Sequence, residues 1–119
     1  MDRSRLFGKE ITRPEHYPHR IFEADPNLVL IANQDFEVGY LTGYSAPFTG
    51  GGKAIFPKGE KIKVTNYVKG AKAADCRPVD YERLQNIIVS EKERSDSKYT
   101  GYGLVITLVD LDRFFDEVT

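Results

Sequence analysis

Two extended segments, separated by glycines and prolines, set the strongest constraint on the fold of this chain. The stretch Tyr40–Val68 begins with an alternating segment before Pro47 and ends with another after Gly59. Between them stand the consecutive glycines Gly50–Gly52. Glycine readily adopts positive φ and proline fixes φ near about −65°, so we expect neither a helix nor a central strand to run through this segment. The pattern predicts a domain built on antiparallel strands.

Composition and charge narrow the classes of protein that fit. The chain has 119 residues, of which 40% are apolar and 29% charged, as in a single globular domain. A formal net charge of −1 disfavours a dedicated nucleic-acid binder, which usually carries a basic excess. No apolar run approaches the roughly 20 residues that span a bilayer, and no apolar stretch follows the charged N-terminus. With Cys76 as its single cysteine, the chain is expected in the reducing cytoplasm.

The order of segments predicts an arm followed by one domain. Residues 1–27 are rich in arginine and proline and show no period, so we expect an extended N-terminal arm, and residues 28–119 form a single α+β domain. Leu28–Ala32 is apolar throughout and predicts a buried strand. Phe36–Tyr40 alternates, so a polar turn would join the two as a hairpin. A further short strand is expected at Ala54–Phe56.

Helical periodicity appears in the C-terminal third of the chain. It predicts amphipathic helices over Asp80–Val89 and Asp110–Val118, each capped by its first aspartate, with the preceding valine as part of a hydrophobic staple. Ser90 and Glu93 have the spacing of a capping box, which predicts a further helical turn. Gly103–Val109 is apolar on both faces and predicts a central strand covered by helices. The fold class is therefore α+β: mainly antiparallel strands in a small bent sheet or open barrel, with two short amphipathic helices.

Two motifs resemble chemical sites but miss the required patterns. Thr49–Lys53 reads TGGGK, yet a phosphate-binding P-loop would need glycine at Pro47 and serine or threonine at Ala54. His16 and His19 are spaced as metal ligands on a helix, but neighbouring prolines make their segment extended, and zinc needs two more ligands. We therefore expect no metal and no cofactor.

Nucleophilic catalysis has equally little support. Arg77 could lower the pKa of the Cys76 thiol, but a structural thiol is the commoner case. No serine stands in a GxSxG elbow. The sequence identifies no catalytic residue. It favours a non-enzymatic binding module for a protein or a small anionic ligand. The alternative is a small hydrolase or transferase that acts on a phosphorylated or nucleotide substrate held at Thr49–Lys53.

Positive charge concentrates in one part of the chain. Six lysines against one glutamate between Lys53 and Lys72 give a local balance of +5. Alternation places Lys61, Lys63, Thr65 and Tyr67 together on one face of this strand, which could hold a polyanion or single-stranded nucleic acid. The competing interpretation is an edge strand that lysines guard against aggregation.

Tyrosines beside glycines suit a contact surface, and equally a half-buried sheet. With the arm and an exposed sheet edge, they favour a two-fold homodimer over a monomer. The residues that the sequence proposes for binding a ligand or partner are Tyr40, Tyr44, Phe48, Lys53, Lys61, Lys63, Tyr67, Tyr99 and Tyr102.

Several sequence motifs together resemble those of a known group of proteins. The run YSAPFTGG, followed by FPKGEKIKV and then by YERL and YTGYGLVI, resembles small bacterial proteins of the kind carried on mobile integron gene cassettes. The resemblance covers roughly Phe36–Phe115 and rests on turn and core residues. It implies a compact bacterial accessory protein and transfers no catalytic residue.

Overall fold

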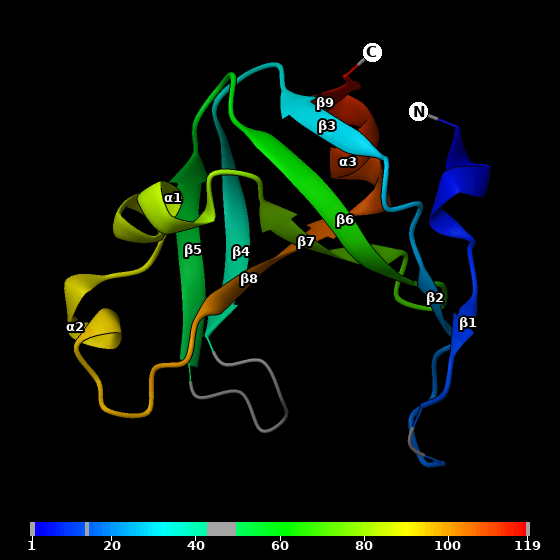
Figure 1. The fold of residues 1–119 in the computed structure, drawn as a ribbon, viewed down its shortest axis with the longest axis horizontal. Helices are drawn as coiled ribbons and strands as arrows, with labels where there is room; N and C mark the ends of the chain where they lie inside the picture. Colours follow the sequence, from blue (N-terminus) through cyan, green and yellow to red (C-terminus); the bar gives the residue numbers. More distant parts are fainter. Residues whose placement is uncertain (1, 14, 43–49, 119) are drawn as a thin grey trace.

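The protein folds as one open antiparallel sheet with short helices at its ends (Figure 1). The computed structural model describes residues 2–13, 15–42 and 50–118. Within this part of the chain, the strands are β1 (Glu10–Ile11), β2 (Ile21–Glu23), β3 (Val29–Ala32), β4 (Phe36–Thr42), β5 (Gly50–Phe56), β6 (Lys61–Val68), β7 (Ala73–Pro78), β8 (Tyr102–Thr107) and β9 (Phe115–Glu117). The helices are η1 (Arg3–Leu6), α1 (Tyr81–Ile88), α2 (Glu91–Arg94) and α3 (Leu108–Phe114). The predicted α+β class, with antiparallel strands in an open, bent sheet, is confirmed.

Strand β6 is the centre of the sheet. The strand order is β1-β2-β6-β7-β8-β4-β5, and β3 pairs with both β6 and β9. One edge of β6 bonds to β3 near Lys61 and to β2 near Val68, while the other edge bonds to β7. Figure 1 shows β4 and β5 steeply inclined to β6, so the sheet is strongly bent. Residues of the N-terminal arm thus contribute two strands, β1 and β2, to the sheet.

The core lies between the inner face of the bent sheet and residues from η1, α1 and α3. Leu6, Leu84 and Leu111 bring one fully buried side chain from each of these three helices. At one end of the core Phe36 stacks on Phe114, with ring centroids 5.0 Å apart, and meets Phe115 edge-on at 5.2 Å. Such aromatic pairs stabilise a core beyond the area that they bury.

The predicted hairpin between the first two strands of the domain is wrong. Strand β3 pairs with β6 and β9, and not with β4. The turn between β3 and β4 is held instead by Asp35, whose carboxylate accepts a hydrogen bond of 2.6 Å from the backbone N–H of Lys58. Ala32 N–H also donates to the carbonyl of Glu60 at 2.9 Å. These bonds tie the β3–β4 turn to the β5–β6 turn, so neighbours in sequence are not paired in space.

The glycines expected in a connecting loop form the start of strand β5. Gly50 to Phe56 pair residue by residue with β4, from Thr42 to Phe36. This strand lies at the edge of the sheet, where it needs a partner on one side only. A Cβ on Gly51 would lie 2.6 Å from the carbonyl oxygen of Tyr40. Glycine therefore permits a close approach of the two backbones.

A β-bulge at Thr65 divides β6 into two halves. Val64 pairs with Cys76, but the next pair is Asn66 with Asp75, so Thr65 is the extra residue. Its hydroxyl donates a hydrogen bond of 2.9 Å to the backbone carbonyl of Asp75. A bulge shifts the alternation by one residue, and Tyr67 therefore lies in the core. The prediction that Tyr67 shares a face with Lys61 and Lys63 is wrong.

The C-terminal segments depart from their predicted bounds. Strand β8 buries one face only, since Val105 and Thr107 are exposed, and its expected cover on both faces is wrong. The last helix begins earlier, capped by Thr107, whose hydroxyl accepts from Asp110 N–H at 3.2 Å. It ends at Phe114, because Phe115 enters strand β9 and pairs with Ala32 of β3.

Of the caps predicted for α1 and α2, only that of α2 is present. Ser90 caps α2 and accepts a hydrogen bond from Glu93 N–H at 3.2 Å, which confirms the predicted helical turn and its serine cap. Asp80 makes no side-chain capping bond and pairs with Arg83 instead, at 2.7 Å. Val79 is 52% exposed, so it forms no staple.

Candidate functional site: a groove on the open face of the sheet

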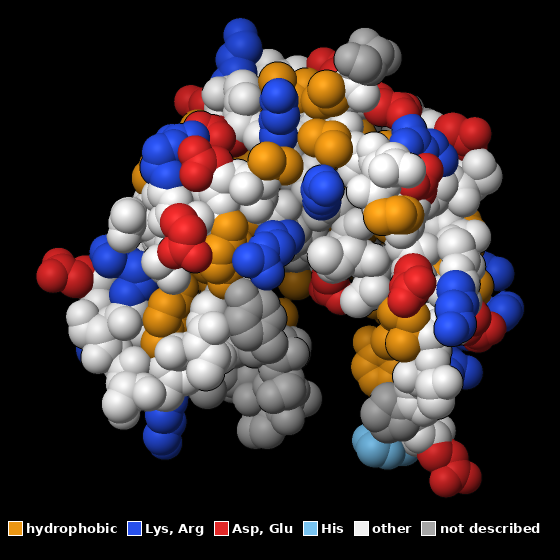
Figure 2. Space-filling model, viewed as in Figure 1, with side chains coloured by type: hydrophobic (Ala, Val, Ile, Leu, Met, Phe, Trp, Pro, Cys, Tyr) orange, Lys and Arg blue, Asp and Glu red, His pale blue; other side chains and the backbone are white. Residues whose placement is uncertain are grey.

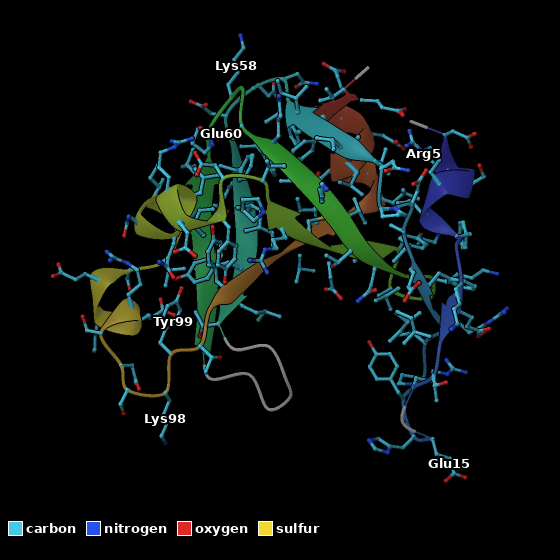
Figure 3. The ribbon with its side chains drawn as sticks, viewed as in Figure 1. Arg5, Glu15, Lys58, Glu60, Lys98 and Tyr99 are labelled. Atoms are coloured by element: carbon cyan, nitrogen blue, oxygen red, sulfur yellow. The ribbon has the colours of Figure 1, made fainter. Side chains whose placement is uncertain are left out.

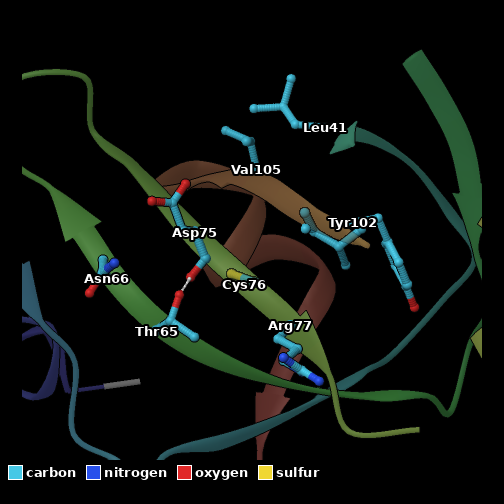
Figure 4. A pocket seen from close by; sticks show the side chains of 10 residues that line it. Leu41, Thr65, Asn66, Asp75, Cys76, Arg77, Tyr102 and Val105 are labelled. Carbon is cyan, nitrogen blue, oxygen red and sulfur yellow. Dashed lines mark hydrogen bonds between the residues drawn. The ribbon is translucent and has the colours of Figure 1, made fainter. Parts of the chain in front are cut away.

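The face of the sheet that points away from the core carries a hollow, drawn in Figure 4. We call this surface the open face; it is formed by the outward residues of β4, β6, β7 and β8. The hollow, called the groove below, has a volume of about 360 Å³, within the range of pockets that hold small molecules. Its lining residues are Leu41, Thr65, Asn66, Asp75, Cys76, Arg77, Tyr102, Gly103, Leu104 and Val105.

Two glycines stand on the open face, and one of them lies in the groove. On adjacent strands of the open face, Gly103 lines the groove and Gly39 pairs with Val105. A Cβ on either glycine would meet no backbone atom closer than 3.9 Å, which is ordinary contact. Neither has a positive φ, in contrast to Gly59 and Gly101. The backbone therefore accepts a larger residue at both positions, and their lack of side chains leaves space above the sheet.

Asp75 brings a negative charge without a partner to the groove. No hydrogen bond or ion pair of its carboxylate is found among the described residues. The surrounding protein partly desolvates the carboxylate, which raises its pKa. The side chain of Asp75 is exposed on the open face, so its carboxylate is accessible to a ligand that donates hydrogen bonds to it.

Arg77 brings a positive charge from the same strand and the same face. Its guanidinium carbon lies 3.9 Å from the ring centroid of Tyr81, a cation–π contact that orients the group. The Tyr81 ring in turn stacks on Tyr102, with centroids 4.5 Å apart. No acidic partner of Arg77 occurs in the described part of the chain. In Figure 4 the Asp75 carboxylate and the Arg77 guanidinium point away from each other.

Lysines extend the positive charge beside the groove. Lys63 stands directly opposite Arg77 in the β6–β7 ladder, and Lys61 precedes it on the same face. Like charges directly opposite each other in a sheet are destabilising. Neither lysine has an ion pair with any residue that the structure describes. Figure 2 shows basic side chains in a row over the middle of this view, with apolar ones beside them.

A second hollow adjoins the groove. It has a volume of about 280 Å³; Val105 lines both hollows, and Gly39 lines the second. Lys53 lines it, and its ammonium lies 3.6 Å from the Glu37 carboxylate, with both side chains largely exposed. Lys53 is thus placed on the open face but is already matched by an acid.

The structure brings together only part of the set that the sequence proposed. Lys61 and Lys63 lie together beside the groove. Tyr40, Tyr67 and Tyr102 are buried, so these three side chains belong to the packing of the sheet and offer no exposed contact surface. Tyr99 is half-buried, and Figure 3 shows it between α2 and β8, where its hydroxyl donates to Gln85 at 2.7 Å.

The buried tyrosines hold helices to the sheet instead. The hydroxyl of Tyr40 donates to Glu93 of α2 at 2.5 Å, a contact that raises the pKa of Tyr40 to about 12. Tyr44 and Phe48 lie outside the described residues.

The structure also shows where the motifs that resemble chemical sites lie. Cys76 faces the core, and burial followed by the nearby Asp75 charge raises the pKa of its thiol, which agrees with the structural thiol that the sequence favoured over one activated by Arg77. Gly51 and Gly52 belong to a regular strand without positive φ, so they do not form the concave N–H nest that binds anions. Among the described residues, no three His, Cys, Asp or Glu side chains lie together in a way that could hold a metal ion.

Comparisons with known proteins add no relative. The chain matches no protein-family model, no curated protein and no solved structure. Across the described residues, the helices are too short and too polar to cross a membrane.

Sequence reasoning passed over the residues that line the groove. Asp75 and Arg77 were considered only as neighbours of Cys76. The alternation in the run AADCRP was the available signal, because it places these two charges on one face and Cys76 on the other. The strand partners that bring Gly103 beside Arg77 are distant in sequence and gave no local signal.

Proposed function

We propose that this protein is a non-enzymatic binding module whose groove on the open face receives a small anionic ligand. The observation that carries the proposal is that Lys63 pairs with Arg77 across β6 and β7, and that Arg77 lines the same groove as Gly103 of the neighbouring strand β8. Lys63 and Arg77 have no acidic partner in the described chain, and the groove leaves an empty space beside them.

The arrangement of Arg77 favours recognition over a purely structural role. Arg77 is exposed on the open face, and the acid on its own strand, Asp75, is not bonded to it. Stacking on Tyr81 leaves the N–H edges of the guanidinium free to donate to a carboxylate or phosphate. Lys63 and Lys61 add a diffuse positive potential that attracts an anion to the same place.

Chemical-shift perturbation tests this proposal with inorganic phosphate and citrate as probes. We expect the amides of β7 and β8 that line the groove to shift on titration, and the shifts to disappear in Arg77→Gln. Gly103→Val fills the groove, so it should abolish the shifts while leaving the melting temperature equal or higher, because valine favours strands. Lys58→Gln is the matched control, since Figure 3 shows Lys58 at the tip of the β5–β6 turn, away from the groove.

Other results would contradict the proposed anion site. If neither anion shifts the groove amides, or if Arg77→Gln and Lys58→Gln weaken binding equally, the groove is not the anion site. Binding that survives in Gly103→Val would place the anion elsewhere on the basic surface.

A further inference from the structure

An anion alone does not match all the charges in the groove, because the negative Asp75 carboxylate would face it. Asp75 and Arg77 are two residues apart on one face of β7, which separates their Cα atoms by roughly 6.6 Å. Both side chains line the groove, and neither is bonded to the other. A ligand bearing only negative charge would gain at Arg77 and be repelled at Asp75.

The groove between these charges is mainly apolar. Leu41 and Val105 stand along it from β4 and β8, and Gly103 opens it. Figure 4 shows Val105 beside the Asp75 carboxylate, with Leu41 beyond it. A short hydrocarbon segment fits against these side chains better than a second hydrated group does.

We infer that the ligand is a compact zwitterion, with a primary amine at Asp75, a carboxylate or phosphate at Arg77 and Lys63, and a short apolar body over Gly103. This inference rests on the proposed anion site and adds the second charge. An ammonium group offers three hydrogen-bond donors, which suits a carboxylate with no other partner in the described residues. The desolvation that raises the pKa of Asp75 also strengthens its attraction to a bound cation.

Pairs of probes that differ only in the amine test the roles of the two charges separately. We propose calorimetric titration with 4-aminobutyrate, 5-aminopentanoate and O-phosphorylethanolamine, each compared with an anion that lacks the amine: butyrate, pentanoate and ethyl phosphate. At pH 7.5 we expect at least one amine-bearing probe to bind about tenfold tighter than its partner. The best chain length among the probes reports the spacing of the two charges, and a phosphate preference distinguishes the two kinds of anion.

Variants assign the preference to its residue. Asp75→Asn keeps the shape of the side chain and should remove the tenfold preference while binding of the amine-free anions stays equal or improves. Glu82→Gln, an exposed acid on α1, is the matched control and should change nothing. Arg77→Gln should weaken both kinds of probe.

The two proposals fail differently. If amine-free anions bind in an Arg77-dependent manner but the amine adds nothing, or if Asp75→Asn keeps the preference, the zwitterion inference is overturned and the anion site stands. If no probe binds, both fail together.

Discussion

Replacing Tyr102 with alanine gives the strongest test of whether the tyrosines belong to the core or to a contact surface. Tyr102 is 1% exposed. Its hydroxyl donates to the Tyr81 carbonyl at 2.8 Å, its N–H donates to the Tyr81 hydroxyl at 2.9 Å, and the two rings stack. Truncating a buried aromatic side chain costs about 3–5 kcal/mol. A domain of 119 residues has a total free energy of unfolding of roughly 6–18 kcal/mol, so this loss is a large share of it.

The expected change in melting temperature follows from the chain length. An unfolding entropy of about 2.1 cal/mol/K per residue gives about 0.25 kcal/mol/K for 119 residues, so Tyr102→Ala should lower the melting temperature by about 12–20 °C. Scanning calorimetry and urea denaturation measure both quantities. Tyr102→Phe, which loses one hydrogen bond, should cost about 1 kcal/mol, and exposed Lys61→Ala less than about 0.5 kcal/mol. A loss below about 1 kcal/mol for Tyr102→Ala would refute its place in the core.

Two further predictions concern the turn before β6 and the clamp on the N-terminal arm. Gly59 has φ of +87° and nothing within 4 Å of its Cβ position, so Gly59→Ala should lower the free energy of unfolding by about 1–2 kcal/mol through backbone strain alone. Gly59→Asn should lower it by less, because asparagine tolerates positive φ better. Equal stability of the parent and both variants in urea would contradict this. The Asp25 carboxylate accepts hydrogen bonds from Asn27 N–H at 2.9 Å and from Arg5 Nε at 3.0 Å. Both bonds lower the pKa of Asp25, and the bond from Asn27 has the larger effect. The stabilisation is therefore complete above the unfolded pKa of about 3.9 and is lost as pH falls through the lower folded value. Asp25→Asn should be less stable than the parent at pH 7, and the gap should narrow below about pH 3; a gap in urea that does not depend on pH would contradict the assignment.

The sequence predicted which segments are extended better than how they pair. Alternation located β4 and β6, because a half-buried strand must place every second side chain in the core. Partner choice depended on contacts distant in sequence. Asp35 bonds to the backbone of Lys58 rather than closing a hairpin, and β3 pairs with β6. No local rule contains that information.

Two further errors have distinct physical causes. The apolar residues of the last segment have helical spacing, but Phe115 gains more by packing edge-on against Phe36 and pairing with β3 than by continuing the helix. In β6, one inserted residue, Thr65, reversed the alternation and moved Tyr67 from the expected binding face to the core. A bulge leaves no reliable signal in composition, so the lysines were placed correctly and the tyrosine was not.

The groove itself is a feature that the stability of the fold does not require. Glycine inside a strand costs roughly 0.5–1 kcal/mol relative to alanine, so Gly39 and Gly103 together cost about 1–2 kcal/mol. At Gly51 that cost is compensated, because any side chain would collide with the Tyr40 backbone. At Gly39 and Gly103 the Cβ positions are free and φ is not positive, so no such compensation exists. The same rows contain Asp75 and Arg77, which remain unpaired within the described chain. Valine at Gly103 would stabilise the sheet and fill the groove, and valine at Gly39 would fill the adjoining hollow. The ligand-binding proposal accounts for why these hollows are there.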